Sequence, residues 1–82
     1  MSDQDLLARV TLDPAVMLGK PVIRGTRLTV DYLLNLLAHG ATPDEILDEY
    51  RGLQREDIQA ALLFASRSLA STAFMPLVAE LA

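Results

Sequence analysis

Four consecutive residues near the middle of the chain, Thr42-Pro43-Asp44-Glu45, restrict the fold more than any other segment. A threonine followed three residues later by a glutamate forms a capping box, in which each side chain accepts a hydrogen bond from the other residue's backbone N–H. Proline is favoured in the first helical turn, where its missing N–H would have no partner. The segment therefore predicts the start of a helix, which we expect over 43–50.

Hydrophobic spacing predicts one helix before this segment and one after it. The first helix is expected over 30–39, with Thr29 as its N-cap and Gly40 just beyond its end. Its apolar residues recur at the spacing of one buried face: Val30, Leu33, Leu34 and Leu37. The other helix is expected over 55–71, after a short turn that contains Gly52. Its expected inner face consists of Ile58, Ala61, Leu62, Ala65 and Leu69.

Two short segments favour β-strands: 9–12, and 27–30 at the start of the first expected helix. We expect them to pair with each other within one subunit or across a dimer. Residues 1–8 form an N-terminal arm, either frayed or folded as one short helix. The expected fold is mainly α, with three helices and a short N-terminal β element in one domain over 9–72. The turn between the second and third helices has the length found in helix-turn-helix units.

Composition excludes several classes of protein. The 82 residues suit one domain, and 51% of them are hydrophobic. A chain this short buries a modest share of its surface, and Tyr32 and Leu36 lie off the inner helix face, so we expect a two-fold homodimer. The absence of cysteine excludes disulfides and thiol catalysis. No apolar signal-peptide region or membrane-spanning run is visible, so we expect a cytoplasmic protein without membrane association.

The segment GKPVIRGTR at 19–27 carries three of the seven basic residues, on a chain of net charge −4. Lys20, Arg24 and Arg27 could bind phosphates, together with backbone N–H groups of the turn. The segment lacks the spacing of a Walker loop and of a dinucleotide fingerprint. The alternative is a structural turn whose arginines pair with the acids at 44–49.

The three-helix pattern also suits a DNA reader, in which the third helix lies in the major groove. Gln54, Arg55 and Gln59 would then contact base edges. Glu56 and Asp57 in the same turn would repel phosphates, and the alternative is that they complement the helix dipole in a unit that packs without DNA.

Catalytic chemistry has little support in the sequence. His39 is the only histidine, and at the end of a helix it is expected to serve as a cap. The acids at 44–49 lie on one short helix, where a solvated face is the expected role. Without a nucleophile–base pair, a metal cluster or a cofactor loop, we expect no enzymatic activity, no metal and no cofactor.

Residues 73–82 form an apolar C-terminal tail with a single charge. An apolar segment at a chain end can enter a groove of a partner protein. The residues expected to bind the partner are Phe74, Met75, Leu77, Val78 and Leu81. The alternative is that the tail packs on its own core or on a second copy of the chain.

The GKPVIRGTR string, the segment 40–46 and the residues around Tyr50, Leu53 and 56–58 resemble a small prokaryotic family called domain of unknown function 433. The resemblance covers residues 9–70. It implies a homeodomain-like helix-turn-helix with a short β element, and an antitoxin encoded beside a PIN-like ribonuclease toxin. By this analogy the chain would bind that toxin and also operator DNA, and the alternative is an interaction or dimerisation module that binds no DNA. One departure is Gln54, where the family often has a threonine or serine cap.

Overall fold

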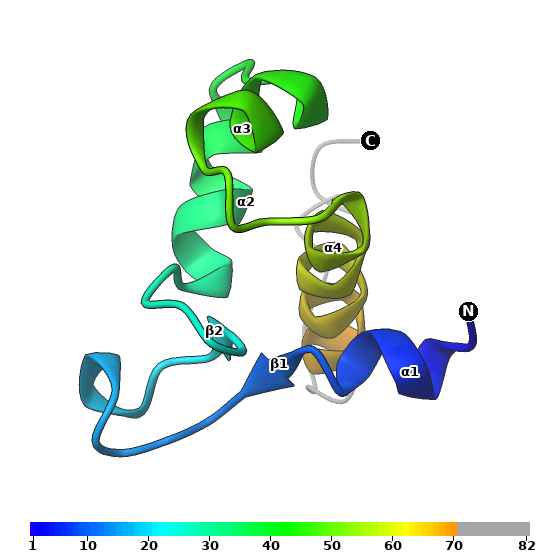
Figure 1. Cartoon of the computed structure of the whole chain (residues 1–82). Helices are drawn as coiled ribbons and strands as arrows, with labels where there is room; N and C mark the ends of the chain where they lie inside the picture. Colours follow the sequence, from blue (N-terminus) through cyan, green and yellow to red (C-terminus); the bar gives the residue numbers. More distant parts are fainter. Residues whose placement is uncertain (71–82) are drawn as a thin grey trace, which may run out of the picture.

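The computed structural model describes residues 1–70, and these residues are mainly helical with one small sheet (Figure 1). The elements are α1 (Asp3–Leu7), β1 (Val10–Thr11), the 3-10 turn η1 (Met17–Gly19), β2 (Val22–Ile23), α2 (Val30–Ala38), α3 (Pro43–Glu49) and α4 (Arg55–Ala70). The three predicted helices and the mainly α architecture are thereby confirmed. The predicted tail over 73–82, with its five candidate partner-binding residues, lies outside the described residues.

Local hydrogen bonds explain where the helices begin and end. The capping box at α3 is present: Thr42 N donates to Glu45 Oε1 over 2.8 Å, and Glu45 N donates to Thr42 Oγ1 over 3.2 Å. Thr29 caps α2 by accepting a hydrogen bond from the backbone N–H of Tyr32 at 3.0 Å. At the other end of α2, the His39 ring Nδ1 lies 2.8 Å from the carbonyl oxygen of Asn35, as expected for a capping role.

The β element differs from the prediction, because the second strand is Val22–Ile23 and not 27–30. It pairs antiparallel with β1, with Val10 opposite Ile23. Gly25 has a φ of +80°, so the chain reverses just after β2. Residues 27–29 then return along the other edge of β2, where Ile23 N donates to the carbonyl oxygen of Leu28 over 2.9 Å. The segment predicted to pair with 9–12 is therefore separated from it by β2.

The core is formed between β2 and the last three helices. Its buried apolar residues are Ile23, Val30, Leu33, Ile46, Leu53, Ile58 and Ala61. Helix α4 contacts α1, α2, α3 and β1, so it organises the domain (Figure 1). Ala60 and Ala61 are fully buried, and these small side chains allow close packing of α4.

Two residues of the expected inner face of α4 are exposed. Leu62 is 49% exposed and Leu69 is 62% exposed. The buried residues of α4 are Asp57, Ile58, Ala60 and Ala61, so its buried face lies in the first half of the helix and includes Asp57 and Ala60. The prediction that Leu62 and Leu69 belong to the buried face of this helix was therefore wrong.

The N-terminal residues adopt the second of the two predicted forms, a short helix. Ser2 and Asp5 form a capping box at the start of α1. The carboxylate of Asp3 accepts a hydrogen bond from Arg67 Nη2 at 2.7 Å, which joins α1 to the last turn of α4. Helix α1 thus packs against α4 as part of the domain (Figure 1).

Candidate functional site

The three cations of the basic segment line three hollows of the surface. Arg24 donates a hydrogen bond to the backbone carbonyl oxygen of Ala8 and lines a hollow with Arg9 and Asp57. Lys20 and Arg27 line a second hollow, next to α2, and Arg24 and Arg27 together line a third, with a volume of about 610 Å³. Within residues 1–70 the side chains of Lys20 and Arg27 have no hydrogen bond or ion-pair partner. Among residues 1–70, neither arginine of the segment pairs with an acid of α3, and phosphate binding by the three cations stays a prediction.

A cluster of polar side chains joins the first turn of α4 to Arg9, the residue before β1. Arg9 Nη1 donates to Gln54 Oε1 over 3.0 Å and to Asp57 Oδ1 over 2.9 Å. The other carboxylate oxygen of Asp57 accepts the backbone N–H of Gln54 at 2.8 Å. Asp57 thus supplies the cap that Gln54 lacks, and the exposed Gln54 side chain, predicted to read DNA, is hydrogen-bonded to Arg9.

The other two predicted base contacts lie in different surroundings. Arg55 pairs with Asp44, so it joins α4 to α3. Gln59 is exposed, and its side chain has no hydrogen-bond partner among residues 1–70. The segment 43–59 contains six acids and two arginines, so its net charge is −4. Phosphates approaching it would be repelled.

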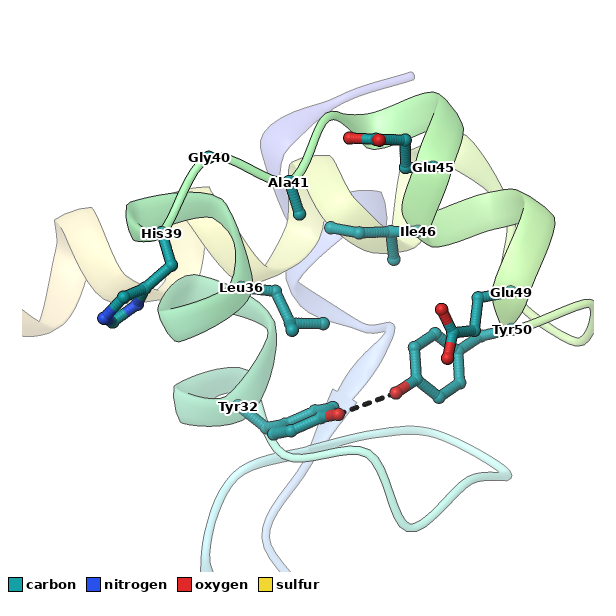
Figure 2. A pocket seen from close by; sticks show the side chains of 9 residues that line it. All are labelled: Tyr32, Leu36, His39, Gly40, Ala41, Glu45, Ile46, Glu49 and Tyr50. Atoms are coloured by element: carbon teal, nitrogen blue, oxygen red, sulfur yellow. Dashed lines mark hydrogen bonds between the residues drawn. The ribbon is translucent and has the colours of Figure 1, made fainter.

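Two tyrosines form a second polar contact, between α2 and the end of α3. The hydroxyl oxygens of Tyr32 and Tyr50 are 2.7 Å apart, and the two rings meet edge to face with centroids 6.2 Å apart. Tyr32 remains 42% exposed, so the pair lies at the surface. Figure 2 shows the hydroxyl contact beside Glu49 and Leu36.

A hollow lies on each side of this tyrosine pair. We call the first the acidic hollow; it has a volume of about 400 Å³, and its lining includes Tyr32, Leu36, Glu45, Ile46, Glu49 and Tyr50 (Figure 2). We call the second the basic hollow; it has a volume of about 460 Å³, and its lining includes Lys20, Arg27, Asp31, Tyr32, Asn35 and Tyr50. The tyrosines belong to both, so the two hollows are neighbours.

The contact with Tyr32 changes the acidity of its partner. The hydrogen bond between the Tyr50 and Tyr32 hydroxyls raises the pKa of Tyr50 to about 12, and partial desolvation and the charge of Glu49 act in the same direction. Because this pKa is raised above its ordinary value of 10.0, the contribution of Tyr50 to folding is complete below pH 10 and is lost as the pH rises toward 12.

Removing the Tyr32 hydroxyl tests this contact. In Tyr32→Phe, we expect the pKa of Tyr50 to fall toward its ordinary value, because the largest cause of the shift is gone. The chain has two tyrosines, so in this variant an absorbance titration of phenolate reports Tyr50 alone. Leu36→Met is a control that leaves both hydroxyls in place. A pKa that stays near 12 in Tyr32→Phe would show that the hydrogen bond is not its cause.

Sequence reasoning missed Arg9 and the tyrosine contact, because both depend on partners far along the chain. Arg9 was considered only as part of a strand, and Tyr32 only as a residue outside the inner helix face. For Asp57, the signal was an acid three residues after Gln54, the spacing at which a carboxylate can accept the N-cap backbone N–H.

The family model described as protein of unknown function DUF433 matches residues 10–65, which include the basic segment and both tyrosines. This chain belongs to the DUF433 family. It is similar to the crystal structure of a DUF433 member protein from Anabaena variabilis ATCC 29413, with 34% sequence identity and a TM-score of 0.71. That match covers 78% of this chain, which spans 63% of the other chain's length. No curated protein matches the chain significantly.

The DUF433 match leaves α1 and the last turn of α4 outside its bounds, and Arg9 just precedes it. Among residues 1–70, no helix is long and apolar enough to cross a membrane. In the same part of the chain, no group of three or more histidine, aspartate or glutamate side chains could hold a metal ion.

Proposed function

We propose that this DUF433 chain is an antitoxin-like protein that acts by binding a partner protein, a PIN-like ribonuclease toxin. The family resemblance suggests this class of partner. The observation that carries the proposal is the distribution of side chains along α4. The first turn of this helix is bonded within the molecule, whereas Leu62 and Leu69, further along it, are exposed to solvent.

Leu62 and Leu69 form what we call the outer stripe of α4. They are seven residues apart, so two helical turns place them on the same side. Both are exposed large apolar side chains, and an apolar helix face of this kind suits a groove on a partner protein. In the sequence, the apolar tail follows this stripe, and its residues remain predicted partner contacts.

Operator DNA has weaker support than the protein partner. A recognition helix needs free polar side chains in its first turn, but Gln54 and Arg55 are bonded to Arg9 and Asp44. The net charge of −4 over 43–59 also opposes approach to phosphates. The same observation favours the second candidate function, an interaction module that binds neither DNA nor a toxin.

Capture of a PIN-like protein encoded in the adjacent reading frame tests the proposal. We expect Leu69→Glu to weaken capture by about tenfold or more, since a charge would enter an apolar contact. Leu12→Glu is the matched control, because Leu12 and Leu69 are both 62% exposed and Leu12 lies outside α4. Relief of toxin growth arrest by the wild-type chain, reduced only by the Leu69 variant, is the expected readout in cells.

Other results would contradict the proposal in distinct ways. Equal capture by both variants would exclude the outer stripe as the contact. Failure of the wild-type chain to bind a PIN-like protein would favour the interaction module. A gel shift with upstream DNA would restore the operator role, provided that Arg27→Ala weakens it on all sequences and Arg55→Ala changes its sequence preference.

A further inference from the structure

The two hollows beside the tyrosine pair carry opposite charge. The basic hollow contains Lys20 and Arg27 with one carboxylate, Asp31, so its net charge is +1. The acidic hollow contains the carboxylates of Glu45 and Glu49, with His39 at its edge (Figure 2). One continuous surface therefore has a positive half and a negative half, with the tyrosines between them.

These charges are available to a partner. Lys20, Arg27 and Glu49 have no hydrogen bond or ion pair with other side chains of residues 1–70. Glu45 uses one carboxylate oxygen for the capping box and remains exposed. Charges that are unpaired within a subunit can favour association when a partner brings the opposite charge to them.

A surface with two opposite halves is complementary to a copy of itself. If a two-fold axis runs between the halves, rotation brings the positive half of one copy onto the negative half of the other, and the reverse. We propose that a second copy of this chain docks here, about an axis that passes beside the Tyr32–Tyr50 pair. Each dimer then contains two equivalent sets of contacts between Lys20 and Arg27 of one subunit and Glu45 and Glu49 of the other.

Apolar side chains between the two halves suit the centre of such an interface. Tyr32 is 42% exposed, and Leu36 is half-buried one turn further along the same side of α2. In Figure 2 both side chains point toward α3, which supplies the other wall of the acidic hollow. Interface cores are enriched in aromatic residues surrounded by a polar rim, and this surface has that composition.

A second copy fits better than other occupants of this surface. Nucleic acid would meet Glu45 and Glu49 beside the basic residues, and these carboxylates would repel its phosphates. A short domain also gains from covering exposed surface with a second subunit. The proposal is independent of the proposed toxin contact, because the outer stripe of α4 contributes to neither hollow.

A charge exchange between two variants tests the two-fold arrangement. The first variant is Lys20→Glu/Arg27→Glu, which makes the basic hollow acidic. The second is Glu45→Gln/Glu49→Lys, which makes the acidic hollow basic while glutamine preserves the acceptor of the capping box. We expect the wild-type chain to sediment at twice the 9.0 kDa monomer mass at micromolar concentration. Each variant alone should dissociate at least about tenfold more readily, because like charges then face each other.

An equimolar mixture of the two variants gives the decisive result. Both sets of contacts in the heterodimer pair opposite charges, so we expect the mixture to regain the dimer mass, and native mass spectrometry should identify one subunit of each kind. Circular dichroism checks that each variant is folded. Arg51→Glu and Leu69→Glu are controls outside both hollows and should remain dimeric. A monomeric wild-type chain, a dimer that survives both variants, or a mixture that stays monomeric would overturn the proposal.

Discussion

Replacing Leu33 with alanine is expected to destabilise the domain by about 3 kcal/mol. Leu33 has no exposed surface, and it lies in the apolar cluster that includes Ile23, Ile46 and Ile58. Truncation removes its buried methyl groups and leaves a cavity that the surrounding helices fill only in part. Small domains have a total stability of about 5–15 kcal/mol, so this loss would be a large share of it.

Urea unfolding followed by circular dichroism measures this loss. Leu62→Ala is the matched control, because it is the same chemical change at a leucine that is 49% exposed in α4. We expect the control to change the free energy of unfolding by about 0.5 kcal/mol or less. Equal losses in the two variants would mean that α4 and α2 are packed differently from this structure.

Asp57→Ala is expected to cost about 2–3 kcal/mol, although the replaced residue is charged. Asp57 is 7% exposed, and its two carboxylate oxygens bind Arg9 and the backbone N–H of Gln54. The alanine variant removes the cap of α4 and leaves the partly buried Arg9 guanidinium without its counter-charge. Both consequences destabilise the contact between β1 and the start of α4.

A comparison with Asp48→Ala isolates this effect. Asp48 is an exposed acid of α3 without a hydrogen bond or ion pair to other residues of 1–70, so its removal should leave the free energy of unfolding nearly unchanged. The double variant Arg9→Ala/Asp57→Ala should lose less than the sum of the single variants, because the two side chains interact directly. Strict additivity would contradict a direct ion pair.

Helices were predictable where their signals are local. The side chains of Thr42 and Glu45 accept each other's backbone N–H within a stretch of four residues, and Thr29 caps the helical turn that follows it. The second strand was not predictable in this way, since the alternation at 27–30 resembles a strand that continues into α2. The turn at Gly25 decides the pairing, and its effect is to bring Val22 and Ile23 between the two predicted strands.

The sequence allowed the residue types of the candidate site to be predicted, but not how their side chains are arranged in space. The segment 19–27 was identified by its charge, yet the structure distributes its cations over three hollows, one of which Arg24 and Arg27 share. The ion pair of Arg9 with Asp57 spans 48 positions in the sequence, and the contact of Tyr32 with Tyr50 spans 18. Such contacts depend on how whole elements pack, so hydrophobic periodicity and capping rules contain no information about them.

The hydrogen bond between Arg67 and Asp3 has a consequence for the order of folding. These residues are 64 positions apart, so their contact closes nearly the whole described chain into one loop. The entropic cost of closing a loop grows with its length, and it is lower once α2, α3 and α4 have already brought the ends together. Docking of α1 is thus expected to be the last step of folding, and hydrogen exchange should find its amides the first to open.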